Sequence, residues 1–150
     1  MEVSSVIPRI LPTEASVIGY TPIGNEPDYR ALLPRLLGSQ DLLLPPTADY
    51  EPFYCADLCE RHFERTPVSL FIPGTRFDLR GTRHGRGGGW YDRFLASVPK
   101  DWIRVGVMKL SQIAAVPLTR NEWDQPVDWL LAFDGTSWQA FETHARTKGE

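Results

Sequence analysis

The residues at positions 83–93 are the part of this chain best suited to bind an anion. They comprise four glycines, three arginines, one histidine, two aromatic residues and one carboxylate, directly after a run typical of a buried strand. Glycines let backbone N–H groups gather around phosphate oxygens, and arginines donate charge-assisted hydrogen bonds to them. A helix that begins after the loop adds the partial positive charge of its N-terminus. The stretch therefore predicts a phosphate-binding loop.

Two common phosphate-binding motifs do not match these glycines. A Walker A loop needs a lysine after its last glycine, and none follows here. The dinucleotide fingerprint fails because its third glycine falls on Trp90 when counted from Gly85, and on Asp92 when counted from Gly87. Arginine–glycine segments that bind RNA are disordered repeats, whereas this is one copy between a strand and a helix. A tight strand-to-helix connection remains the simpler alternative, although three arginines exceed what a turn requires.

Composition and charge limit the classes of protein that this chain can represent. A length of 150 residues with 42% hydrophobic residues predicts one globular domain, residues 1–150. The net charge of -3 argues against a general nucleic-acid or anionic-membrane binder. Residues 76–93 nevertheless hold five arginines against two aspartates, which predicts a local basic pocket for a small anion.

The cysteines and the apolar runs indicate the compartment. Cys55 and Cys59 are the only cysteines, too few for a zinc cage or a secreted disulfide framework, so we expect two reduced thiols. No charged and then apolar leader opens the sequence, and no apolar run approaches the ~20 residues of a membrane span. We therefore expect a cytoplasmic protein that binds neither membranes nor nucleic acids.

Short apolar runs bounded by turn residues predict six strands, at residues 15–21, 41–44, 68–72, 103–107, 127–133 and 137–141. Helical spacing predicts helices between Pro27 and Gly38, at 55–65, and from Gly89 or Trp90 onward. In the second of these, Leu58, Cys59, His62 and Phe63 are expected to face inward. This alternation predicts an α/β three-layer sandwich with a mainly parallel sheet, whose ligands bind at the carboxyl ends of the strands. We expect residues 1–14 to form an extended arm and 144–150 a disordered tail.

Two segments carry a family resemblance. Residues 72–78 (IPGTRFD) and 81–95 (GTRHGRGGGWYDRFL) resemble the signature of the 5-formyltetrahydrofolate cyclo-ligase family, also called methenyltetrahydrofolate synthetases. Residues 104–107 and 116–128 are similar to the family's downstream blocks, and 20–26 to its strand-then-glutamate element. The resemblance implies a fold similar to that of sugar-phosphate isomerases and CoA transferases. It also implies an ATP- and Mg²⁺-dependent ligase of one-carbon metabolism that converts 5-formyltetrahydrofolate to 5,10-methenyltetrahydrofolate, releasing ADP and phosphate.

The same resemblance suggests roles for individual residues. Asp92 and Asp124 would hold Mg²⁺, and Glu26 with Trp90 would contact the reduced folate. Arg86 and Tyr91 would take part in catalysis. The residues expected at the ATP are Arg83, His84, Gly85, Arg86, Gly87, Gly88, Gly89, Trp90 and Tyr91.

Other interpretations of these residues remain open. Asp92 could only support the first turn of a helix, and Asp124 could be a turn carboxylate before Pro126. Trp90 could belong to the core, and His84 could be a solvated loop residue.

The chain departs at its N-terminus from the family that it resembles. Family members usually begin with a basic helix whose lysine and arginine reach the ATP phosphates, whereas residues 1–14 offer only Arg9. One hypothesis is a shortened cyclo-ligase, a monomer or small homo-oligomer, in which Arg76, Arg80 or a partner subunit replaces the missing cation. The second is a non-catalytic relative that binds a nucleotide or folate, or has an interaction role. A different activity on the same scaffold is a third.

Overall fold

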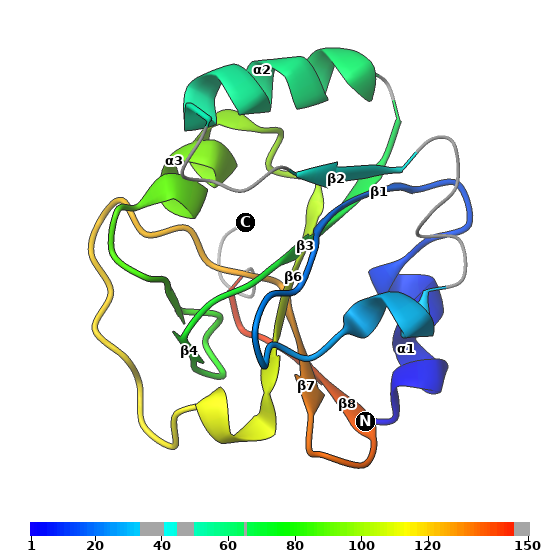
Figure 1. Ribbon diagram of the computed structural model, residues 1–150, viewed down its shortest axis with the longest axis vertical. Helices are drawn as coiled ribbons and strands as arrows, with labels where there is room; N and C mark the ends of the chain where they lie inside the picture. The colour runs from blue at the N-terminus through cyan, green and yellow to red at the C-terminus, as the bar shows by residue number, and fades with distance from the viewer. Residues whose placement is uncertain (34–40, 45–49, 65, 146–150) are drawn as a thin grey trace.

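Six strands form one mixed sheet through the middle of the protein (Figure 1). Five neighbouring strands run parallel, and the sixth, at one edge, runs antiparallel to them. The computed structural model describes residues 1–33, 41–44, 50–64 and 66–145. The strand order is β2-β1-β3-β6-β7-β8, and β8 pairs antiparallel with β7. The strands are β1 Ser16–Tyr20, β2 Leu42–Leu44, β3 Val68–Ile72, β6 Ile103–Lys109, β7 Trp129–Phe133 and β8 Trp138–Glu142. All six predicted strands are confirmed, as is the mainly parallel α/β sheet.

Helices cover both faces of the sheet. On one face lie α2 (Pro52–His62) and α3 (Trp90–Ser97), which share a buried cluster with Leu70, Ile72 and Leu130. On the other face α1 (Val3–Ile10) packs against Val105 and Leu131 in a second cluster. Neighbouring residues of β3 therefore point to opposite layers, which explains why all five of its residues are buried. The short helices η1 (Tyr29–Leu32) and η3 (Leu110–Gln112) lie in connections.

The prediction of an extended arm at residues 1–14 is wrong over Val3–Ile10, which is helical. Val3, Val6 and Ile10 recur on one side of this helix and are buried. Pro8 lies in its last turn, and Leu11 still donates to the Ile7 carbonyl. Burial of this apolar side outweighs the hydrogen bond that the proline removes.

Helix α2 was predicted over 55–65, and it begins three residues earlier. Glu51 caps it, because its carboxylate accepts hydrogen bonds from the N–H groups of Phe53 and Tyr54. The prediction that Leu58 and His62 face inward is wrong, since both are exposed. The residues that face inward are Cys55, Ala56, Cys59 and Phe63. Helix α2 packs most closely against α3, and both thiols are free.

Two predictions lie partly outside the described residues. Of the helix predicted between Pro27 and Gly38, the structure describes η1, and residues 34–40 are outside it. Of the tail predicted at 144–150, residues 146–150 are outside it. Within the described residues, every helix is too short or too polar to cross a membrane.

Candidate functional site

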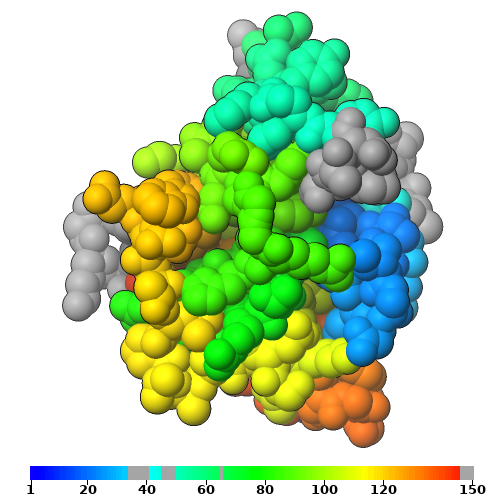
Figure 2. Space-filling model, turned by 60° about the vertical axis from the view of Figure 1, so that its left-hand side comes forward, coloured from blue at the N-terminus to red at the C-terminus, as the bar shows by residue number. Residues whose placement is uncertain are grey.

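A cleft of about 970 Å³ opens at the carboxyl ends of the parallel strands. Its walls come from the ends of β1, β3 and β6, from the glycine loop (residues 85–89) and from the segment that holds Asp124. In Figure 2 the green part of the chain, which includes the glycine loop, crosses this face between a blue segment on the right and an orange segment on the left. The predicted site residues that line the cleft are Glu26, Arg83, His84, Gly85, Arg86, Gly87, Gly88, Gly89, Trp90, Tyr91, Asp92 and Asp124.

The glycine loop presents backbone donors without internal partners. It connects the short hairpin β4 (Arg76–Phe77) and β5 (Arg83–His84) to α3, and Gly89 is the N-cap of α3 in the left-handed conformation. Among the described residues, none accepts a hydrogen bond from the backbone N–H groups of residues 85–89. Such N–H groups at the start of a helix are suited to bind phosphate oxygens.

Two side chains hold the carbonyl groups of this loop. The Thr75 hydroxyl donates to the carbonyls of His84 (3.0 Å) and Gly85 (3.3 Å), and Arg93 Nη2 donates to that of Gly88 (2.7 Å). In a trans peptide the N–H points away from the carbonyl of the preceding residue. Holding these carbonyls therefore fixes the directions of the N–H groups that follow them.

Arg83 places a positive charge at the base of the loop. The residue is 8% exposed, its Nε donates to the Pro73 carbonyl, and its guanidinium lies 4.8 Å from the centre of the Tyr91 ring. Burial lowers the pKa of Arg83, and the neighbouring Tyr91 and Asp92 act in the opposite direction. Among the described residues no carboxylate forms an ion pair with it. A buried cation of this kind favours an anionic ligand.

Arg86 and Glu26 meet across the mouth of the cleft. Arg86 Nη2 lies 3.7 Å from Glu26 Oε2, and the Arg86 side chain is 68% exposed. The other Glu26 oxygen accepts a hydrogen bond from the Ile23 N–H at 2.8 Å. Glu26 is thus held by its own loop, while Arg86 remains free to turn toward a ligand.

Asp92 and Asp124 lie next to each other in the cleft, from different parts of the chain. Asp92 is in the first turn of α3, and its Oδ1 accepts from the Gln125 N–H at 2.9 Å. Burial raises the pKa of Asp92, and the adjacent Asp124 carboxyl raises it further through its charge and a side-chain hydrogen bond. Two such carboxylates suit a divalent cation, which would relieve their repulsion. The described residues contain no group of three or more metal-binding side chains, so phosphate oxygens and water would supply the other ligands of Mg²⁺.

The two aromatic residues after the loop serve both the core and the cleft. The Trp90 ring stacks on Phe94 with centres 5.2 Å apart, and its Nε1 donates to the Tyr50 carbonyl. Tyr91 is 7% exposed, and burial raises the pKa of its hydroxyl despite the nearby Arg83. The Trp90 ring therefore packs inward on one side, as the core interpretation expects, and lines the cleft on the other, while its contact with a ligand stays a prediction.

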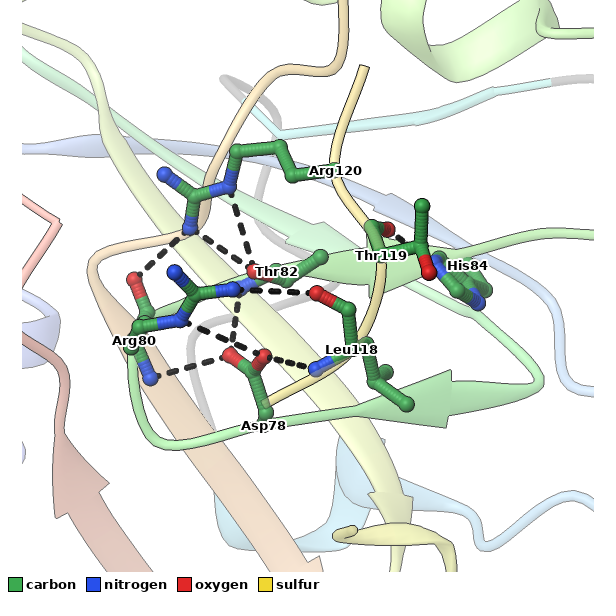
Figure 3. A network of polar contacts seen from close by, with 7 residues as sticks. All are labelled: Asp78, Arg80, Thr82, His84, Leu118, Thr119 and Arg120. Carbon is green, nitrogen blue, oxygen red and sulfur yellow. Dashed lines mark hydrogen bonds and ion pairs between the residues drawn. The ribbon is translucent and has the colours of Figure 1, made fainter. Parts of the chain in front are cut away.

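A polar network joins the hairpin before the glycine loop to the segment before Asp124 (Figure 3). The Asp78 carboxylate is buried and accepts hydrogen bonds from the N–H groups of Arg80, Thr82 and Leu118. The Arg120 guanidinium donates to the Thr82 hydroxyl and to the Arg80 carbonyl. The His84 imidazole shares a hydrogen bond with the Thr119 carbonyl at 2.7 Å. His84 therefore connects the two segments, in addition to lining the cleft.

The hypothesis that Arg76 or Arg80 supplies a missing cation is not supported. Neither lines the cleft, and Arg80 donates to the Leu118 carbonyl and lies near Asp78 instead. Arg9 of α1 is engaged elsewhere, with Glu142 and over the Trp129 ring.

Sequence reasoning missed several further cleft residues, three of which carry a charge or an aromatic ring. Tyr20, Lys109 and Trp123 line the cleft, and Trp123 is 66% exposed. Tyr20 and Lys109 are the last residues of β1 and β6. A polar residue at the end of an apolar strand was the available signal, since parallel strands end at the same edge of the sheet.

Comparisons with known proteins agree with this geometry. The sequence profile of the 5-formyltetrahydrofolate cyclo-ligase family matches residues 56–132, about half of the 150-residue chain. The chain is similar to the solved structure of the Aquifex aeolicus 5,10-methenyltetrahydrofolate synthetase, at 25% identity and a TM-score of 0.61, over 95% of this chain and 78% of that one. It also shares the fold of the synthetase from Mycoplasma pneumoniae, at 19% identity and a TM-score of 0.58, over 85% of this chain and 79% of that one. Curated protein sequences give no match.

Proposed function

Because the chain belongs to the 5-formyltetrahydrofolate cyclo-ligase family, we propose that it uses Mg-ATP to convert 5-formyltetrahydrofolate to 5,10-methenyltetrahydrofolate, with release of ADP and phosphate. The observation that carries the proposal is the meeting of three features in one cleft. These are the N–H groups of residues 85–89, which have no acceptor among the described residues, the buried Arg83 cation, and the adjacent carboxylates of Asp92 and Asp124.

The reaction explains why the cleft needs these groups. A formamide carbon is a poor electrophile, so the formyl oxygen first attacks the γ-phosphorus and ADP leaves. The neighbouring folate N–H nitrogen then attacks the formyl carbon and gives up its proton, closing the ring, and the phosphorylated oxygen leaves as phosphate. Phosphoryl transfer depends mainly on alignment and charge neutralisation.

Each group has a role in this reaction. The N–H groups of the glycine loop, with Arg83 and Arg86, bind phosphate oxygens and stabilise the charge that develops on them. Tyr91, fixed beneath Arg83, borders the reacting groups. Glu26 and Trp90, which also line the cleft, orient the folate. Mg²⁺ held by Asp92 and Asp124 would neutralise phosphate charge.

The test is the formation of the methenyl chromophore. Purified protein with 5-formyltetrahydrofolate should develop its absorbance only when Mg-ATP is present, and Asp124→Ala should abolish most of the signal. Asp101→Ala, at an exposed position outside the cleft, is the control and should match wild type. A wild-type protein without turnover would contradict the proposal.

A non-catalytic binding protein is the second candidate. It is favoured by α1, whose single cation is engaged with Glu142 and Trp129 rather than with the cleft. Calorimetric binding of Mg-ATP or folate without chromophore formation would support this candidate over the enzyme.

A further inference from the structure

The charges of the cleft are unevenly paired. Its arginines and lysine are Arg83, Arg86 and Lys109, and its carboxylates are Glu26, Asp92 and Asp124. Arg86 lies near Glu26, and Arg83 is buried against Tyr91. Lys109 has no carboxylate within ion-pair distance in the part of the chain that the structure describes. Its ammonium group is therefore available to a ligand.

The backbone of Lys109 is tied to the base of the glycine loop. It is the half-buried last residue of β6, and its N–H donates to Gln112 Oε1 at 2.7 Å. Gln112 Nε2 donates in turn to the carbonyls of Gly74 (3.3 Å) and Thr75 (3.0 Å). Thr75 holds the carbonyls of His84 and Gly85. The backbone of Lys109 is thus connected through Gln112 and Thr75 to the start of the glycine loop, and this connection fixes the position of the Lys109 backbone relative to the loop.

We infer that Lys109 binds an oxyanion of the ligand in this cleft. The inference rests on the proposed function, and it assigns the cation that neither Arg76 nor Arg80 provides. An ammonium group is a compact charge with three donors, and it suits a phosphate of the nucleotide or a carboxylate of the folate glutamate equally. These two sources differ in which ligand loses affinity when the charge is removed.

The experiment measures binding without turnover, by calorimetry of Mg-ATP and of 5-formyltetrahydrofolate in separate titrations. Lys109→Met keeps the length of the side chain and removes its charge, and Lys109→Arg restores a cation. Lys100→Met removes an exposed lysine outside the cleft and serves as the matched control. Unfolding midpoints of all variants establish that each one is folded.

Lys109→Met should lower the affinity for one ligand by about tenfold or more, as expected for loss of a charge-assisted hydrogen bond. The dependence of that affinity on salt should become shallower, and Lys109→Arg should recover most of the loss. Weaker binding of the nucleotide would show that Lys109 binds a phosphate, and weaker binding of the folate would show that it binds the glutamate carboxylate. Lys100→Met should leave both affinities unchanged.

Equal binding of both ligands by wild type and Lys109→Met would overturn the inference, as would an equal loss in Lys100→Met. The binding result tests the Lys109 inference without reference to catalysis. The proposed function is tested separately, and it fails when wild type binds both ligands but shows no turnover. Tripolyphosphate is titrated as a third probe. If wild type binds none of the three, the proposed function and the Lys109 inference fail together.

Discussion

Asp92 is held in a position that disfavours its own charge. Burial and the adjacent Asp124 raise the pKa of Asp92, so ionisation at neutral pH costs the folded state stability. Because the folded pKa is raised, this cost is fully present above the folded pKa and disappears as the pH falls from the folded value to the unfolded one. Such an arrangement, in which paired carboxylates lower the stability of the folded protein but favour a bound cation, is typical of a functional site.

We therefore expect Asp92→Asn to keep or increase stability while it removes function. The amide oxygen can still accept from the Gln125 N–H, and the repulsion with Asp124 is gone. Chemical unfolding at pH 7 should give a free energy of unfolding at or above that of wild type. Mg²⁺-dependent ATP binding, measured by calorimetry, should be lost. A clear loss of stability would indicate that Asp92 is mainly a structural carboxylate.

The glycines of the loop are not equivalent, and this provides a matched pair of variants. Gly87 has a φ of 108°, which residues with a side chain rarely adopt, whereas Gly88 does not have a positive φ. A Cβ at either position would meet no atom within 4 Å, so the two differ in backbone conformation and not in the space available. Gly87→Ala should cost roughly 1–2 kcal/mol of stability or shift the loop, and so weaken nucleotide binding. Gly88→Ala should bind nucleotide almost normally. Equal affinities of the two variants would show that the conformation at Gly87 does not matter for binding.

The glycine loop could be predicted from sequence because its donors are contiguous. The position of Asp124 came from a family resemblance, and its contact with Asp92 depends on two distant segments meeting. Tyr20 and Lys109 were missed because each is unremarkable in its own strand. They come together only because β1 and β6 both lie beside β3 and end at the same edge of the sheet.

The hairpin of β4 and β5 acts as a support for the site, with Asp78 as its main connection. Burial would raise the pKa of Asp78, but hydrogen bonds from the N–H groups of Leu118, Thr82 and Arg80 outweigh it, and the pKa is lowered. A lowered folded pKa stabilises the protein above the unfolded value of about 4, and this contribution is lost as the pH falls through the folded value.

Asp78→Asn should therefore be destabilising by about 1–3 kcal/mol at pH 7, because the amide cannot accept from all three donors equally well. The difference from wild type in free energy of unfolding should shrink below about pH 4, because the Asp78 carboxylate of the unfolded wild-type chain becomes protonated there while that of the folded protein stays ionised. Urea unfolding at pH 7 and pH 3.5 measures both values. A difference that is independent of pH would contradict the role of the charge.

Helix α1 shows where prediction from sequence failed at the level of elements. The two prolines of residues 1–14 suggested an extended arm, yet Val3, Val6 and Ile10 lie on one buried side of the helix. Intrinsic propensity was a weaker influence than packing against the sheet. The same principle explains α2, whose inward side is formed by small residues rather than by Leu58.

At the scale of the whole molecule, the parallel sheet was predictable because its strands are short, apolar and separated by helices. The site follows from this topology, since consecutive strand ends converge on one edge. The inward and outward sides of the helices were less predictable, because they depend on the shapes that pack against them.

Ligand binding should stabilise the entire fold. If Mg-ATP binds the folded state alone, a concentration one hundred times its Kd adds about 2.7 kcal/mol, or roughly 5–10 °C in the unfolding midpoint. Differential scanning fluorimetry measures the shift, and Asp92→Asn should not show it. An unchanged wild-type midpoint at saturating Mg-ATP would argue against nucleotide binding.

The network of Figure 3 links the hairpin before the glycine loop to the segment before Asp124 through groups of the protein alone. The conformational entropy of these two segments is therefore lost during folding, and little remains to be lost on binding. Preorganisation of this kind makes affinity sensitive to residues that never touch the ligand. Loosening the network at Asp78 should shorten the residence time of a bound nucleotide, although every group that contacts the nucleotide is still present.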